Sequence, residues 1–218
     1  MSEQPKFRMA RRLTSAFLAM VMVASMSQAE TVAAHPSELR FGLHLSEIAI
    51  EGNHVQDVEA LFRTLKYKVV RKSWASGWQQ LNEFLYKNAS DKTRVRKAAY
   101  FAHGWTHIID PELVILTEEK ILAKESQLLH AKIVVWLSES ASDSYGFWVY
   151  DHGRLLRGVL SADGTLKGSG RRLSAEENVN WKGAGEDEIL DLAHRLGPGF
   201  DAFEGNLHFR LYDLDEQP

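Results

Sequence analysis

The sequence predicts one α+β domain, in which an antiparallel β-sheet meander carries three to four packed amphipathic helices. Three observations lead to this fold class. Short strand-like runs between residues 132 and 160 are separated by turns rich in Asp and Gly, which is typical of antiparallel hairpins. Apolar stripes at helical spacing occur elsewhere along the chain. These stripes and the strands do not alternate in the regular βαβ rhythm of a parallel sheet.

The first half of the chain is expected to contain both strands and helices. Asn53 and Gln56 resemble a capping box in front of an apolar stripe, so a helix is predicted there. Ser76 and Gln79 form a second capping pair before another such stripe. A turn at His103-Gly104 separates two strands. The strands predicted in this half are residues 39–45, extended at 48–50, then 67–70, 95–102 and 105–109.

The second half is expected to be a hairpin series followed by one helix. Thr117 is a predicted cap for a third helix, which precedes the hairpins. The last helix starts at Glu186 and ends before Gly197-Pro198, because Gly adopts a left-handed stop and Pro cannot continue a helix. Residues 161–185 are rich in Gly and charge, so a long loop is expected there. The strands predicted in this half are residues 132–138, 145–150, 154–160 and 207–211, and a further turn at Asp163-Gly164 leads toward residues 165–167.

The first thirty residues have the three-part layout of a secretory signal peptide. Three arginines precede an uncharged apolar run over residues 13–26, and small residues follow at Ser27 and Ala29. The run has fourteen residues, fewer than the ~20 that cross a bilayer, so cleavage near Ala29 is expected, with export to the periplasm or outside the cell. Translation can begin at Met1 or Met9 on this pattern. The predicted organisation is a signal peptide at 1–29, a tether at 30–38, the domain at 39–212 and an acidic tail at 213–218.

Composition excludes several classes of chemistry. The chain has no cysteine, which excludes disulfides, thiol catalysis, iron–sulfur clusters and lipoprotein attachment. Removing the leader's four basic residues and one acid from the totals of 26 and 29 leaves a net charge of −6, which argues against nucleic-acid binding. No phosphate-binding loop, nucleophile elbow or zinc-protease motif is present. No cofactor, metal or catalytic residue is therefore predicted, and outside the leader no run is long and apolar enough for a transmembrane segment.

Charge is unevenly distributed along the remaining chain. Residues 63–97 hold ten basic side chains against two acids, whereas residues 174–218 hold three basic side chains against eleven acids. One interpretation is two solvated faces that neutralise each other in the fold. The other is a basic surface offered to an anionic partner. In that case the expected binding face consists of Arg71, Lys72, Trp74, Arg94, Arg96 and Lys97, with Trp74 as an exposed aromatic anchor.

Part of the chain resembles a group of uncharacterised bacterial proteins. The resemblance rests on Gly104-Trp105-Thr106, Asp110-Pro111-Glu112 and the hairpin from Tyr145 to Arg157, followed by the loop from Gly170 to Glu176. Some members of that group are similar to small immunity proteins that neutralise bacterial toxins. The resemblance implies a protein partner and transfers no catalytic residue.

The function expected from these observations is an exported, non-enzymatic protein-binding module of the immunity or inhibitor type. Its partner would be another protein, either an acidic one or a toxin. Two alternatives stay open. One is a cell-envelope hydrolase using paired carboxylates, for which Asp110, Glu112 and Glu139 near strand ends are the candidates. The other is an envelope protein that binds anionic lipid or glycan through its basic segment.

Overall fold

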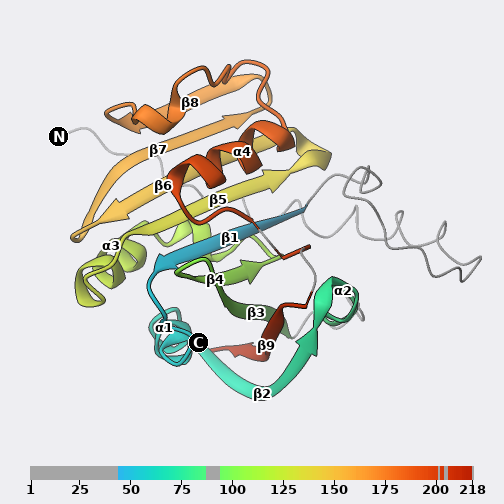
Figure 1. Cartoon of the computed structure of the whole chain (residues 1–218). Helices are drawn as coiled ribbons and strands as arrows, with labels where there is room; N and C mark the ends of the chain where they lie inside the picture. Colours follow the sequence, from blue (N-terminus) through green and yellow to red (C-terminus); the bar gives the residue numbers. More distant parts are fainter. Residues whose placement is uncertain (1–43, 87–93, 201, 204–205, 218) are drawn as a thin grey trace, which may run out of the picture. The chain divides into compact units, whose positions relative to one another are not determined.

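A computed structural model describes residues 44–86, 94–200, 202–203 and 206–217, which form one nine-stranded antiparallel sheet with four α-helices (Figure 1). These residues belong to a single compact unit. The predicted signal peptide and tether lie outside the described residues, as do residues 39–43 of the first predicted strand. The order along the chain is β1 (His44–Glu51), α1 (Val58–Thr64), β2 (Tyr67–Ser76), α2 (Gly77–Tyr86), β3 (Val95–Ala102), β4 (Trp105–Asp110), α3 (Glu119–Leu128), β5 (Ile133–Glu139), β6 (Ser144–Asp151), β7 (Arg154–Ala162), β8 (Thr165–Gly170), α4 (Glu186–Leu196) and β9 (His208–Glu216).

The sheet combines a simple meander with a more complex half. Its strand order is β2-β9-β3-β4-β1-β5-β6-β7-β8. Strands β5 to β8 follow one another as hairpins, which confirms the predicted meander. In the other half, the C-terminal β9 lies between β2 and β3, and the N-terminal β1 lies between β4 and β5. The sheet therefore dominates the fold more than the predicted α+β class implied.

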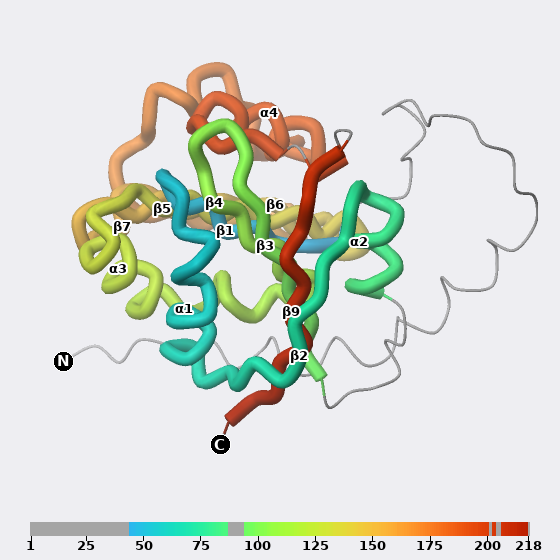
Figure 2. Tube along the Cα trace, turned by 60° about the horizontal axis from the view of Figure 1, so that its bottom comes forward, coloured from blue at the N-terminus to red at the C-terminus, as the bar shows by residue number. Residues whose placement is uncertain are grey.

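Helices cover both faces of the sheet, because alternate side chains of each strand point to opposite sides. On β1, Leu45 and Ala49 belong to one buried cluster, whereas Ile48 and Ile50 belong to the other. Apolar side chains of α2 and α4 pack into the first cluster, and those of α1 and α3 pack into the second. Figure 2 shows α4 on one side of the sheet and α1 and α3 on the other.

The prediction of a long loop over residues 161–185 is wrong for its first part, whereas the turn predicted at Asp163-Gly164 is confirmed. Strand β7 continues to Ala162, and β8 returns along it after a two-residue turn at Asp163-Gly164. Both turn residues have positive φ (50° and 68°), as a tight hairpin turn requires. The sequence of β8, TLKGSG, lacks the apolar alternation that predicts a strand, and all six of its residues are exposed.

The prediction of an acidic tail at residues 213–218 is also wrong for residues 213–216, which belong to a strand. Strand β9 extends to Glu216 and pairs with the basic strand β2, with Lys68 opposite Asp215 and Arg71 opposite Asp213. Opposite charges on directly facing positions stabilise a strand pair. The chain's basic and acidic segments thus meet side by side at one end of the sheet.

Candidate functional site

The predicted basic face is partly neutralised by acids of the same chain. Nε of Arg71 donates to Oδ2 of Asp213 at 2.8 Å, and Nε of Arg96 lies 3.4 Å from Oδ1 of the same carboxylate. Nζ of Lys72 donates to Oε1 of Glu59 at 3.0 Å. The two contacts of Asp213 agree with the interpretation in which the two charged segments offset each other, whereas Lys72 pairs with an acid of α1. Arg94 is exposed at the start of the β3 region.

Lys97 does not belong to a binding surface, which corrects its predicted role. Its side chain is fully buried and its Nζ donates hydrogen bonds to carboxylate oxygens of Asp110 and Glu112. Asp110 lies on the neighbouring strand β4 and also accepts a hydrogen bond from the backbone N–H of Ile115 at 2.7 Å. Burial opposes the charge of Lys97, but the two carboxylates outweigh that effect and raise the pKa of the ammonium above its usual value.

The candidate carboxylates are therefore engaged in structural contacts. Asp110 is fully buried and shares Lys97 with Glu112, so this pair is not arranged to receive a substrate. Glu139 contacts Nδ1 of His44 across the β1–β5 pair, and its Oε1 accepts from the backbone N–H of Ala141 at 3.2 Å. Burial lowers the pKa of His44. These geometries do not favour a paired-carboxylate hydrolase.

Trp74 is the most exposed large apolar side chain of the described residues, at 64%. Its neighbour Ala75 points into the core, so the alternation of β2 places Trp74 on the opposite face, the one that carries α1. The guanidinium of Arg210, directly opposite on β9, lies 5.0 Å from the Trp74 ring centroid. Such cation–π stacking fixes both side chains on the surface. The predicted exposure of Trp74 is confirmed.

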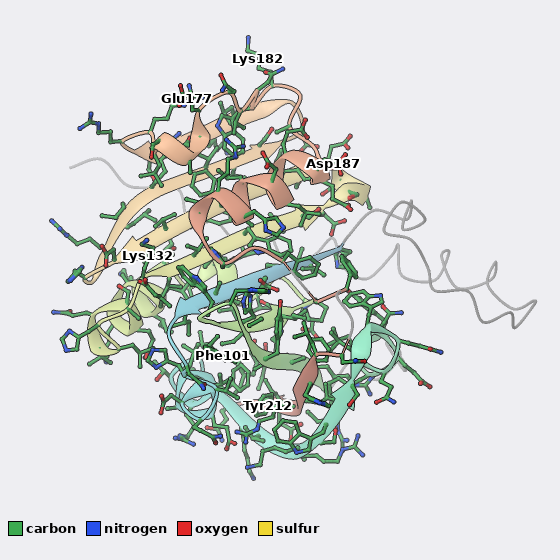
Figure 3. All side chains as sticks on the ribbon, in the orientation of Figure 1. Phe101, Lys132, Glu177, Lys182, Asp187 and Tyr212 are labelled. Atoms are coloured by element: carbon green, nitrogen blue, oxygen red, sulfur yellow. The ribbon has the colours of Figure 1, made fainter. Side chains whose placement is uncertain are left out.

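A shallow groove of about 370 Å³ lies beside Trp74. Phe101 on β3, which is 43% exposed, provides its second large apolar surface. NH1 of Arg210 donates to Oε1 of Gln56 at 3.1 Å, which links the sheet to the turn before α1. Figure 3 places Phe101 and Tyr212 in this part of the molecule. The groove is lined by Asn53, Val55, Gln56, Trp74, Ala99, Tyr100, Phe101, Asn206, Leu207 and His208.

The groove forms where two neighbouring strands separate. The pairing of β3 with β9 ends at Ala99 and Arg210. Beyond that point β3 continues to pair with β4 as far as Ala102, and β9 continues to pair with β2 as far as His208. The two strands thus diverge at this end of the sheet. We refer to the residues that line the resulting space, together with Arg210, as the aromatic groove.

A second polar cluster is buried in the opposite face. Oε1 of Glu47 accepts from Nδ1 of His107 at 2.8 Å and from Nε1 of Trp136 at 3.3 Å. The Tyr100 hydroxyl donates to Oε2 of Glu47 at 3.2 Å, and the Tyr100 ring stacks on His107 with centroids 4.4 Å apart. All four side chains are at most 1% exposed. The cluster has the composition of an acid–base site, but its burial gives no access to a substrate.

Sequence reasoning missed both Arg210 and this buried cluster. Glu47 stands between Leu45 and Ala49 on the inward-facing positions of β1, so strand alternation alone could have found it. Arg210 gave no such signal, because its importance depends on β9 lying next to β2. Among the described residues, no group of three or more His, Asp or Glu side chains is arranged to hold a metal ion.

No family model, curated protein or solved structure matches this chain. Within the described part of the chain, every helix is too short or too polar to cross a membrane.

Proposed function

We propose that this protein is an exported, non-enzymatic binding module, and that another protein docks at its aromatic groove. The single observation that carries the proposal is the exposure of Trp74 beside Arg210 and Phe101. Trp and Arg are the residue types that contribute most binding energy at protein interfaces. The proposed partners include a toxin whose activity this protein would block by docking.

The distribution of exposed apolar side chains supports this location. Five large apolar side chains of the described residues are prominently exposed, and two of them, Trp74 and Phe101, line the same groove, whereas Val70 lies elsewhere on β2. Leu128 on α3 and Leu166 on β8 are the other two. A surface Leu standing alone needs no explanation, whereas a cluster of apolar side chains with a polar rim indicates an interaction site.

Export is supported by the sequence of residues 1–29, which combines basic residues, a short apolar run and small residues at Ser27 and Ala29. Binding of anionic lipid or glycan through the basic segment has less support. Arg71, Lys72 and Arg96 contact acids of the same chain, which reduces the positive field that an anionic surface would meet.

Affinity capture from the cell envelope of the producing host tests the proposal. We expect the tagged full-length chain to retain one near-stoichiometric protein, and Trp74→Ala to reduce its recovery at least tenfold, because truncation of a central Trp costs about 2 kcal/mol or more of binding. The amount retained is measured by quantitative mass spectrometry.

Leu166→Ala is the matched control, because it also removes an exposed apolar side chain, but from the opposite edge of the sheet. It is expected to retain the partner. Equal recovery by the wild-type chain and Trp74→Ala would contradict the proposal.

A further inference from the structure

We infer that the aromatic groove recognises a short acidic segment of its protein partner, in which an apolar or aromatic side chain stands next to a carboxylate. The inference rests on the proposed function and adds the chemistry of the ligand. It is carried by the side chains that line the groove, by their charge and by the contacts of Arg210.

The apolar component of the ligand follows from the two exposed rings. Trp74 and Phe101 stand on the same face of the sheet, on strands separated by β9 alone. An apolar group that covers these rings removes their exposed surface from water, and burial of apolar area is favourable. An apolar side chain seated on these two rings is therefore stabilised.

The charge of the ligand follows from the lining. None of the described residues that line the groove carries a carboxylate. Arg210 borders it and donates to the neutral amide of Gln56, and His208 adds a ring whose Nδ1 lies 3.0 Å from the Ser76 hydroxyl. Glu59 of α1, on the same face, contacts Lys72. A ligand carboxylate beside the guanidinium of Arg210 thus meets a cation, and none of the described lining residues repels it. Hydrogen bonds between oppositely charged groups are stronger than those between neutral groups.

The polar lining suits an extended peptide. Asn53, Gln56 and Asn206 carry amides, which both donate and accept hydrogen bonds. A backbone segment presents N–H and C=O groups that need such partners when they leave water. At about 370 Å³ the groove is at the small end of ligand sites, so it accommodates a short segment.

The test is to pan a display library of random linear peptides at physiological salt on the wild-type chain, Trp74→Ala, Arg210→Gln and the control Leu166→Ala. Wild-type and Leu166→Ala are expected to select peptides with Asp or Glu within two residues of an aromatic side chain or Leu. A synthetic selected peptide is expected to bind wild-type protein about tenfold more tightly than its Asp→Asn counterpart, a difference of about 1.4 kcal/mol. Arg210→Gln is expected to remove that difference.

Three results would overturn the inference: selection without acidic preference, an unchanged Asp–Asn difference in Arg210→Gln, or no peptide that depends on Trp74. The last result, combined with Trp74-dependent capture of a partner, means that a folded surface docks and no linear segment does; the proposed function then stands. If capture itself does not depend on Trp74, the proposed function fails as well.

Discussion

Lys97 illustrates how a residue's role depends on the strand beside it. In the sequence it is one of ten basic residues between positions 63 and 97, and this clustering predicted that it lies on the surface. In the structure it faces Asp110 across the β3–β4 hairpin and is fully buried with it. A buried ion pair costs desolvation, and loss of one partner leaves an uncompensated charge inside the protein.

Lys97→Met is therefore expected to lower the free energy of unfolding by about 3 to 5 kcal/mol, because it leaves Asp110 without its cation. Urea denaturation monitored by circular dichroism measures the change. Arg94→Gln is the control, since Arg94 is exposed, and it is expected to change stability by less than about 0.5 kcal/mol. Similar stabilities for the two variants would show that Lys97 has no structural role.

Individual residues were predictable where local pattern determines exposure. Trp74 is exposed as expected, because its position just before a helix set it apart from Trp78 on the apolar stripe. Trp78 packs against Phe203, with ring centroids 4.3 Å apart. The environments of Lys97 and Arg210 were not predictable in this way, because each depends on a neighbouring strand. Lys97 contacts Asp110 across the β3–β4 hairpin, and Arg210 faces Trp74 on β2, more than a hundred residues away in the sequence.

Among the elements, hairpins joined by Asp or Gly turns were the most predictable. Strand β3 has the predicted bounds, and β4 to β7 differ by one or two residues, because residues with positive φ at the turns determine their ends. Helix α1 begins at Val58, later than its capping pattern predicted. Strands β2 and β9 are longer than predicted, since the charged residues that conceal them in the sequence face one another across the β2–β9 pair.

The segment after β8 is held to the sheet by a buried ion pair. NH2 and Nε of Arg157 on β7 donate to the two carboxylate oxygens of Glu176, each at 2.9 Å, and the backbone N–H of Leu173 donates to Oε1 at 2.8 Å. Burial raises the pKa of Glu176, but these hydrogen bonds outweigh it and keep the pKa below its ordinary value of 4.5.

Glu176→Gln is expected to destabilise the protein at pH 7 by roughly 3 kcal/mol, because Arg157 then lacks its counter-charge. A carboxyl with a lowered folded-state pKa stabilises the fold above its unfolded pKa near 4.5 and loses that contribution as pH falls through the folded value. The difference between wild-type and variant should therefore shrink below pH 4.5.

Urea denaturation at several pH values between 7 and 3 measures this difference. Glu177→Gln, at the exposed neighbouring position, is the control and should match the wild-type chain throughout. A Glu176→Gln difference that stays constant down to pH 3 would refute the role assigned to the ion pair.

At the scale of the whole molecule, the strand order could not be read from the sequence. Insertion of β9 between β2 and β3 joins positions more than a hundred residues apart, and no local signal specifies such a pairing. The aromatic groove is a product of this insertion, since it lies where β9 separates from β3. Sequence alone therefore predicted Trp74 as an anchor but not the surface around it.

Site-specific photo-crosslinking in the producing host tests the central proposal, protein docking at the aromatic groove, most directly. A photoreactive phenylalanine analogue is placed at Phe101, inside the groove, and in a second variant at Leu166 on the opposite edge. We expect one discrete cross-linked protein from position 101 and none from position 166. Cross-links from position 166 alone, or no cross-link from position 101, would contradict it.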